Sequence, residues 1–152
     1  SSGMPDLTGL SISDVATAST LTLAADTISV VNYTGAAAAA CTLPAATAGT
    51  IVIYCQSKDT TGGTATLSFD CAGSDVFATG SVIESRGSSE VTFDTSASGE
   101  TLLTFTPANA ATNLLTTGGQ IAFICYEDGT YHIATKLAAE TTQTTGAFVF
   151  AS

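Results

Sequence analysis

Residues 119–136 read GQIAFICYEDGTYHIATK and predict a β-hairpin. Two runs rich in β-branched and aromatic residues flank Asp128-Gly129, a dipeptide that accepts the two positive φ angles of a type I′ turn. Both faces of the predicted hairpin are largely apolar. Because a sheet in contact with water usually keeps one polar face, we expect this hairpin between two layers of a domain or between two subunits.

The turn also predicts the register of the hairpin. With that dipeptide as the loop, Glu127 lies opposite Thr130 and Cys125 lies opposite His132. Side chains then divide between the two faces by alternation. One face is predicted to carry Ile124, Tyr126, Tyr131 and Ile133, and the other Ile121, Phe123, Cys125, His132 and Ala134.

Further short strands are predicted along the chain, at the spacing of roughly 8 to 12 residues that is typical of sandwiches and barrels. The alanine tract 36–40 is too short to nucleate a helix and is expected to be extended or irregular, and 107–115 is the one expected helical turn. We therefore predict an all-β fold, a single antiparallel β-sandwich or jelly-roll-like barrel of roughly 8 to 11 strands with minimal helix. The expected strands are 20–23, 27–33, 41–43, 50–55, 64–70, 76–77, 82–84, 90–94, 102–106 and 147–151.

The chain of 152 residues is expected to form one domain. Residues 1–18 are interpreted as a tag remnant, Ser-Ser-Gly before Met4, followed by an N-terminal arm whose order depends on a neighbour. Residues 19–152 are expected to form the β domain, ending in an apolar strand at 146–151. Such a strand must be covered, either within its own sheet or by adding to the sheet of a neighbour.

Composition limits the possible partners. Only 11% of the residues are charged, against about 25% in an average soluble domain. The net charge of −10 repels phosphate, so we expect no nucleic-acid partner. The longest apolar runs are far shorter than the roughly 20 residues of a spanning helix, so we expect no membrane partner. The low charge content has two interpretations: either assembly covers part of the surface, or the chain is a compact Thr-rich β domain.

Four cysteines, at positions 41, 55, 71 and 125, allow three fully paired arrangements. No CxxC spacing occurs, and three of the four lie in or beside apolar strand patterns, where a free thiol behaves as a small hydrophobic group. Free buried thiols are favoured over disulfides, because no secretory leader is evident at the start of the sequence.

The sequence shows no clear set of catalytic residues. The predicted register places His132 across from Cys125, so the thiol could be a nucleophile and the imidazole its base. The thiol, however, lies in an apolar strand, and no oxyanion donor can be assigned beside it. We favour a packed histidine and expect no enzyme activity and no catalytic, cofactor-binding or metal-binding residue. The carboxylates at strand ends admit a Ca²⁺ site, although capping of turns is the favoured interpretation. These carboxylates are Asp70, Asp75, Glu84, Glu90, Asp94 and Glu100.

Several short segments carry a family resemblance. They are 42–46 (TLPAA), 49–53 (GTIVI), 65–67 (ATL), 72–75 (AGSD), 119–121 (GQI) and 128–131 (DGTY). In this order they resemble small β-rich accessory proteins of tailed-phage virions: head decoration proteins, head fibres and fibre tips. The resemblance covers roughly residues 33–134, with Tyr131 standing where many relatives have a tryptophan.

The resemblance implies a non-enzymatic structural protein of the virion, a capsid decoration or head-fibre protein. Its expected partners are other copies of itself in a homotrimer, together with the major capsid protein. The candidate assembly contacts lie in the arm and in the last strand: Leu10, Ile12, Val15, Phe148, Val149 and Phe150. The alternative is a receptor- or glycan-binding tip domain of a phage fibre or adhesin, which would use the loops 58–63 and 85–89.

Overall fold

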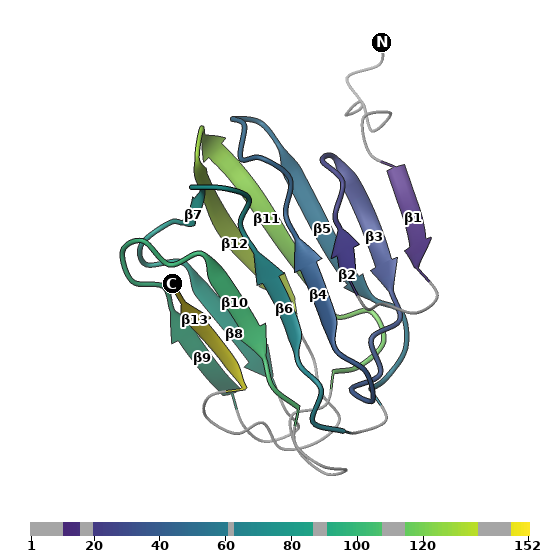
Figure 1. Cartoon of the computed structure of the whole chain (residues 1–152). Coiled ribbons are helices and arrows are strands. Elements are labelled where there is room, and N and C mark those ends of the chain that lie inside the picture. Colours follow the sequence, from purple (N-terminus) through teal and green to yellow (C-terminus); the bar gives the residue numbers. More distant parts are fainter. Residues whose placement is uncertain (1–10, 16–19, 61–62, 87–90, 108–114, 137–146) are drawn as a thin grey trace, which may run out of the picture.

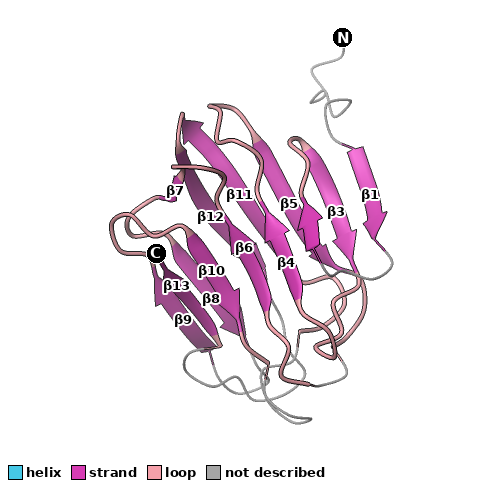
Figure 2. Ribbon diagram, viewed as in Figure 1, coloured by secondary structure: helices cyan, strands magenta, loops and turns pink. Residues whose placement is uncertain are grey.

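The computed structural model describes residues 11–15, 20–60, 63–86, 91–107, 115–136 and 147–152. Within these ranges every regular element is a β-strand, and two large sheets pack face to face (Figures 1 and 2). The all-β prediction is thus confirmed. The described residues include no helix that is long and apolar enough to cross a membrane.

Sheet A has six strands in the order β1-β3-β5-β11-β12-β7. Their bounds are β1 Ser11–Val15, β3 Thr27–Val31, β5 Ile51–Gln56, β7 Val76–Phe77, β11 Gln120–Glu127 and β12 Thr130–Lys136.

Sheet B has five strands in the order β13-β10-β6-β4-β2, and β8 and β9 form a separate two-stranded ribbon. The ribbon covers one side of the sandwich, because β8 lies against β12 of sheet A and β9 lies against β13 of sheet B. The bounds are β2 Thr20–Thr22, β4 Ala39–Thr42, β6 Leu67–Asp70, β8 Val82–Arg86, β9 Val91–Thr95, β10 Leu102–Phe105 and β13 Phe148–Ala151.

The first seven strands alternate between the two sheets. As a result β1, β3 and β5 run parallel in sheet A, and β2, β4 and β6 run parallel in sheet B. The later strands β10, β11, β12 and β13 are added mainly in antiparallel pairs. The predicted antiparallel jelly-roll is therefore wrong in strand direction, and the two sheets do not close into a barrel. A period-two pattern shows which residues share a face of a strand and carries no information about strand direction.

Thirteen strands lie within the described ranges, more than the predicted 8 to 11. One of the additional strands is β1, which occupies part of the expected irregular arm. The alanine tract is also partly regular, because β4 starts at Ala39. The helical turn expected at 107–115 falls mostly on residues 108–114, which lie outside the described residues.

Aromatic rings from both sheets fill the space between the sheets. Tyr54 of sheet A meets Phe69 of sheet B edge to face at 5.1 Å, and Phe69 also contacts Phe123 at 5.1 Å. Phe105 packs against Phe148 at 4.8 Å. All five rings are at most 5% exposed, and the contacts of Phe69 with Tyr54 and Phe123 join the two sheets.

The hairpin forms as predicted, but its register changes next to the turn. Glu127 lies opposite Thr130 as expected, and a β-bulge then leaves Cys125 opposite Tyr131. Because Tyr126 is one extra residue in β11, every side chain of β12 beyond the bulge lies on the opposite face from the one predicted. Tyr131 therefore points into the core with 0% exposure, and His132 lies on the outer face against Tyr126, with ring centroids 4.8 Å apart. The predicted assignment of Tyr131, Ile133, His132 and Ala134 to faces is wrong for this reason.

The tip of the hairpin is tied to distant segments at a junction formed by the loop 44–49, Asp75-Val76 and residues 128–131. The Tyr131 hydroxyl donates to the Pro44 carbonyl at 2.8 Å, and the Gly129 N–H donates to the Ala46 carbonyl at 2.8 Å. Asp75 accepts from the Ala46 N–H at 2.7 Å. Three of the short segments that carry the family resemblance thus meet at one point of the fold.

Candidate functional site

The outer face of sheet A is apolar, although it points away from the core. In β3, Thr27 and Ser29 are buried on the inner side while Ile28 and Val30 point outward. In β5, Gln56 is buried while Ile53 points outward. We define the sheet A outer face by its described outward side chains: Ile28, Val30, Ile51, Ile53, Cys55, Gln120, Ala122, Ile124, His132 and Ala134.

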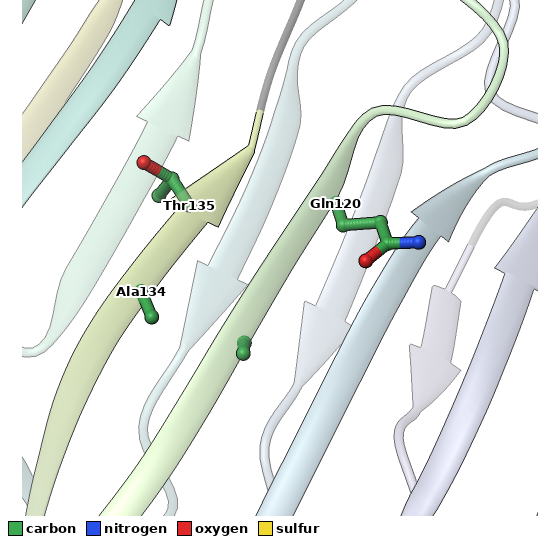
Figure 3. Close-up of a pocket in the computed structure, with 4 residues that line it drawn as sticks. Gln120, Ala134 and Thr135 are labelled. Atoms are coloured by element: carbon green, nitrogen blue, oxygen red, sulfur yellow. The ribbon is translucent and has the colours of Figure 1, made fainter.

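An open hollow of about 180 Å³ lies on this face, over β11 and β12. Figure 3 shows Gln120 on one strand and Ala134 and Thr135 on the other. Ala122 pairs directly with Ala134 across the two strands. The hollow lies where these two methyl groups face each other, and its described lining residues, Gln120, Ala122, Ala134 and Thr135, carry no charge.

A second apolar surface, the ribbon patch, lies on the outer side of β8 and β9. It consists of Val82, Val91 and Phe93, which are 45%, 51% and 72% exposed. Phe93 lies opposite Glu84 in the ribbon register, while the alternate residue Ile83 is fully buried. Large apolar side chains that gather on one exposed surface are typical of contact surfaces.

The structure places the predicted assembly contacts of the last strand in two different environments. Phe148 and Phe150 are each 5% exposed and pack in the core of their own chain, so the last strand completes its own sheet. Val149, between them, is 45% exposed. Leu10 lies outside the described residues, and Ile12 and Val15 lie in β1, for which the structure describes the backbone pairing with β3.

The structure does not bring Cys125 and His132 together. Because of the bulge, Cys125 faces the core and His132 faces outward. The Cys125 thiol donates to the Glu127 carbonyl at 2.9 Å, and burial raises the pKa of Cys125. A thiol that stays protonated and lies on the other side of the sheet from the imidazole does not form a nucleophile and base pair.

The four cysteines are free, and they differ in exposure. Cys41, Cys71 and Cys125 are buried, whereas Cys55 is partly exposed on the sheet A outer face. Burial raises the pKa of Cys41 to about 12. Burial, together with the nearby carboxylates Asp75 and Asp70, raises the pKa of Cys71 to about 12. Cys55 is therefore the thiol that reagents can reach.

Two of the six carboxylates, Asp75 and Glu100, hold loops as the turn-capping interpretation predicts, and Glu90 lies outside the described residues. Asp75 accepts from the Ala46 N–H, and Glu100 accepts from the Ala97 N–H at 2.7 Å. Asp94 of the ribbon accepts from the Phe150 N–H at 2.8 Å and thereby ties β9 to β13. Among the described residues no three metal-ligating side chains lie together.

The loop 58–63, one of the two loops expected to bind a receptor or glycan, is fastened on the N-terminal side of its undescribed residues 61–62. Thr60 is 4% exposed and accepts from the Leu115 N–H at 3.0 Å. Asp59 accepts from Thr117 through both the N–H and the hydroxyl, and these bonds lower the pKa of Asp59. In the second loop, 85–89, Ser85 is buried within β8 and residues 87–89 lie outside the described residues.

Sequence reasoning did not select Val82, Val91 or Phe93. The alternation of Val91, Phe93 and Thr95 against Thr92 and Asp94 did carry a signal, because it predicts one apolar face for this strand. The pattern does not say whether that face points inward, and in the structure it points outward.

Comparison with family models found no match, and comparisons with curated proteins and with solved structures gave no match either.

Proposed function

We propose that this chain is a non-enzymatic structural protein of a phage particle, a capsid decoration or head-fibre protein that acts as a homotrimer. The observation that carries this proposal is the ribbon patch, where Phe93 is 72% exposed beside two exposed valines. Large apolar side chains on a well-packed domain favour contact with another protein. The low charge of the chain and the resemblance in its short segments support the same class.

The arrangement of polar groups also supports a structural role. Carboxylates such as Asp75 and Asp94 are engaged in tying loops and edges, and three of the four thiols are buried. These groups stabilise the fold in the conformations described. The capsid shell is the proposed second partner. Its proposed contact surface is the ribbon patch together with Val149 of the neighbouring strand β13.

Two measurements test this function. Light scattering on protein lacking the first three residues is expected to give the mass of a trimer, and a monomer at every concentration would overturn the homotrimer. Immunogold electron microscopy of particles that carry the gene is expected to label the head or its fibres. Unlabelled particles, together with specific binding of the protein to a glycan array, would instead favour the receptor-binding alternative.

A further inference from the structure

Strand β13 forms one edge of sheet B, and a side chain of the ribbon closes that edge. On its other side β13 pairs with β10, where the Thr106 N–H donates to the Ala147 carbonyl at 2.8 Å. Because main-chain groups alternate between the two sides of a strand, those of Phe148 and Phe150 point away from β10. The Phe150 N–H donates to a carboxylate oxygen of Asp94 in β9 at 2.8 Å. A side chain thus takes a place that a neighbouring strand would otherwise fill.

The ribbon covers this edge without joining the sheet. Strand β9 lies against β13, but in the described strand order it pairs with β8 and is not a strand of sheet B (Figure 1). Asp94 lies opposite Ile83 in the ribbon, and Ile83 is fully buried, so both side chains point toward the sandwich. Natural proteins protect edge strands by covering them and by pointing a charged side chain inward. The ribbon does both at β13.

The sequence of β13 indicates which partner the cover excludes. Residues 141–152 read TTQTTGAFVFAS and contain no charged side chain. Short segments with high β-propensity and low charge pair readily with copies of themselves. If two β13 strands paired antiparallel about Val149, the outward main-chain groups of Phe148 in one copy would meet those of Phe150 in the other. Two chains of net charge −10 also repel each other least where they meet through uncharged segments.

We infer that the ribbon is an autoinhibitory cover of the β13 edge. The edge is closed while Asp94 holds the Phe150 N–H. When the ribbon is released, β13 pairs with β13 of a second copy, and sheet B continues from one copy into the next. This surface is distinct from the exposed ribbon patch, so the inference does not depend on the proposed virion function.

Two variants of Asp94 test the cover. Asp94→Ala removes the acceptor, whereas Asp94→Asn makes the same change in charge and keeps an oxygen that can accept the bond. At equal concentration we expect light scattering to give Asp94→Ala at least about twice the mass of the unmodified protein, and Asp94→Asn an unchanged mass. Adding Val149→Lys to Asp94→Ala should restore the original mass, because like charges directly opposite each other destabilise a strand pair.

Circular dichroism establishes that each variant is folded. An unchanged mass for folded Asp94→Ala would overturn the inference. A gain in mass that Val149→Lys does not remove would also overturn it, and so would an equal gain in Asp94→Asn.

Hydrogen exchange tests the cover in the unmodified chain, so the inference stays testable if Asp94→Ala does not fold. We expect the Phe150 amide and the ribbon amides to exchange together, at least about tenfold faster than the amides of β11 in the core. Ribbon amides that exchange only as slowly as those of β11 would show that the ribbon is never released alone, and would overturn the inference. In folded Asp94→Ala, the Phe150 amide should exchange faster than in the unmodified protein when dilute and become protected on association.

Discussion

From inside the core, Gln56 ties the segment 54–58, to which it belongs, to Tyr33. Its amide oxygen accepts from the Tyr54 hydroxyl at 2.6 Å, and its amide nitrogen donates to the Tyr33 and Lys58 carbonyls at 2.6 and 2.7 Å. The side chain is 0% exposed. All of its polar atoms are therefore paired without help from the solvent.

Replacing this side chain should be costly. Gln56→Leu keeps a similar volume but removes three hydrogen bonds, and each buried group left unpaired costs about 1–3 kcal/mol. We expect the free energy of unfolding to fall by at least about 3 kcal/mol. Urea denaturation measures the loss, and Tyr54→Phe, which removes one of the three bonds, should cost clearly less. Equal losses in the two variants would show that the amide does not tie Tyr33 to this segment.

Gly63 lies against the backbone of a distant loop. A Cβ atom added there would stand 2.1 Å from the Gly35 carbonyl oxygen, and the φ angle of +134° already disfavours other residues. Gly63→Ala should therefore destabilise the fold by more than the roughly 1–3 kcal/mol of backbone strain alone. The control is Gly99→Ala, since Gly99 has a φ angle of +80° and open space around its Cβ position. Thermal unfolding of both variants compares strain with and without the collision.

At the scale of elements, the bulge decides which hairpin side chains enter the core. Tyr126 has no partner in the register, and the strand pairing resumes normally beyond it. Deleting Tyr126 should leave Cys125 and Tyr131 paired and inward, so the core should survive. We expect a loss of about 1 kcal/mol, mainly from the lost ring contact with His132.

The matched control is deletion of Ala122 from the regular part of β11. That change would move one end of the strand by one residue and turn its apolar side chains outward. We expect it to prevent folding, as measured by far-ultraviolet circular dichroism and urea denaturation. If deleting Tyr126 also prevented folding, the bulge itself would be required for the register.

Most of the strands and the hairpin turn could be predicted, because hydrophobic alternation and turn residues are signals that short stretches of sequence carry. The hairpin, its Asp128-Gly129 turn and most strands follow from them. The bulge could not be predicted, since both faces of the hairpin are largely apolar and either register is therefore acceptable. The parallel pairing of β3 with β5 was also inaccessible, because it depends on β4 crossing to the other sheet. The same limit applies to the site, where burial placed Phe148 inside and Phe93 outside.

At the scale of the whole molecule, buried thiols make the fold sensitive to alkali. The pKa values of Cys41 and Cys71 are raised from 9.0 to about 12 in the folded chain. Between these values the folded state keeps protons that the unfolded chain releases, so the free energy of unfolding falls as the pH rises from about 9 to about 12. Urea denaturation at several pH values measures the fall. Cys41→Ala should make it shallower, and an unchanged slope would contradict the assignment.

Salt should also act on the whole molecule. Each copy carries a net charge of −10, so association works against repulsion between copies. The screening length drops from about 30 Å at 0.01 M salt to about 8 Å at 0.15 M. We expect light scattering to show stronger association as salt is added. Weaker association would indicate that ion pairs hold the copies together.

The junction at the hairpin tip has a consequence for how such a protein can diverge. The loop 44–49 takes part in the junction through main-chain groups, which are the Pro44 and Ala46 carbonyls and the N–H groups of Ala46 and Ala48. A carbonyl or N–H group of the main chain can make the same bond whatever side chain the residue carries. Most side chains of the loop can therefore change over evolution without loss of the hydrogen bonds at the junction. Descent within this architecture would then be recorded at a few widely separated positions, among them Asp75, Asp128 and Gly129, while the sequence between them drifts freely.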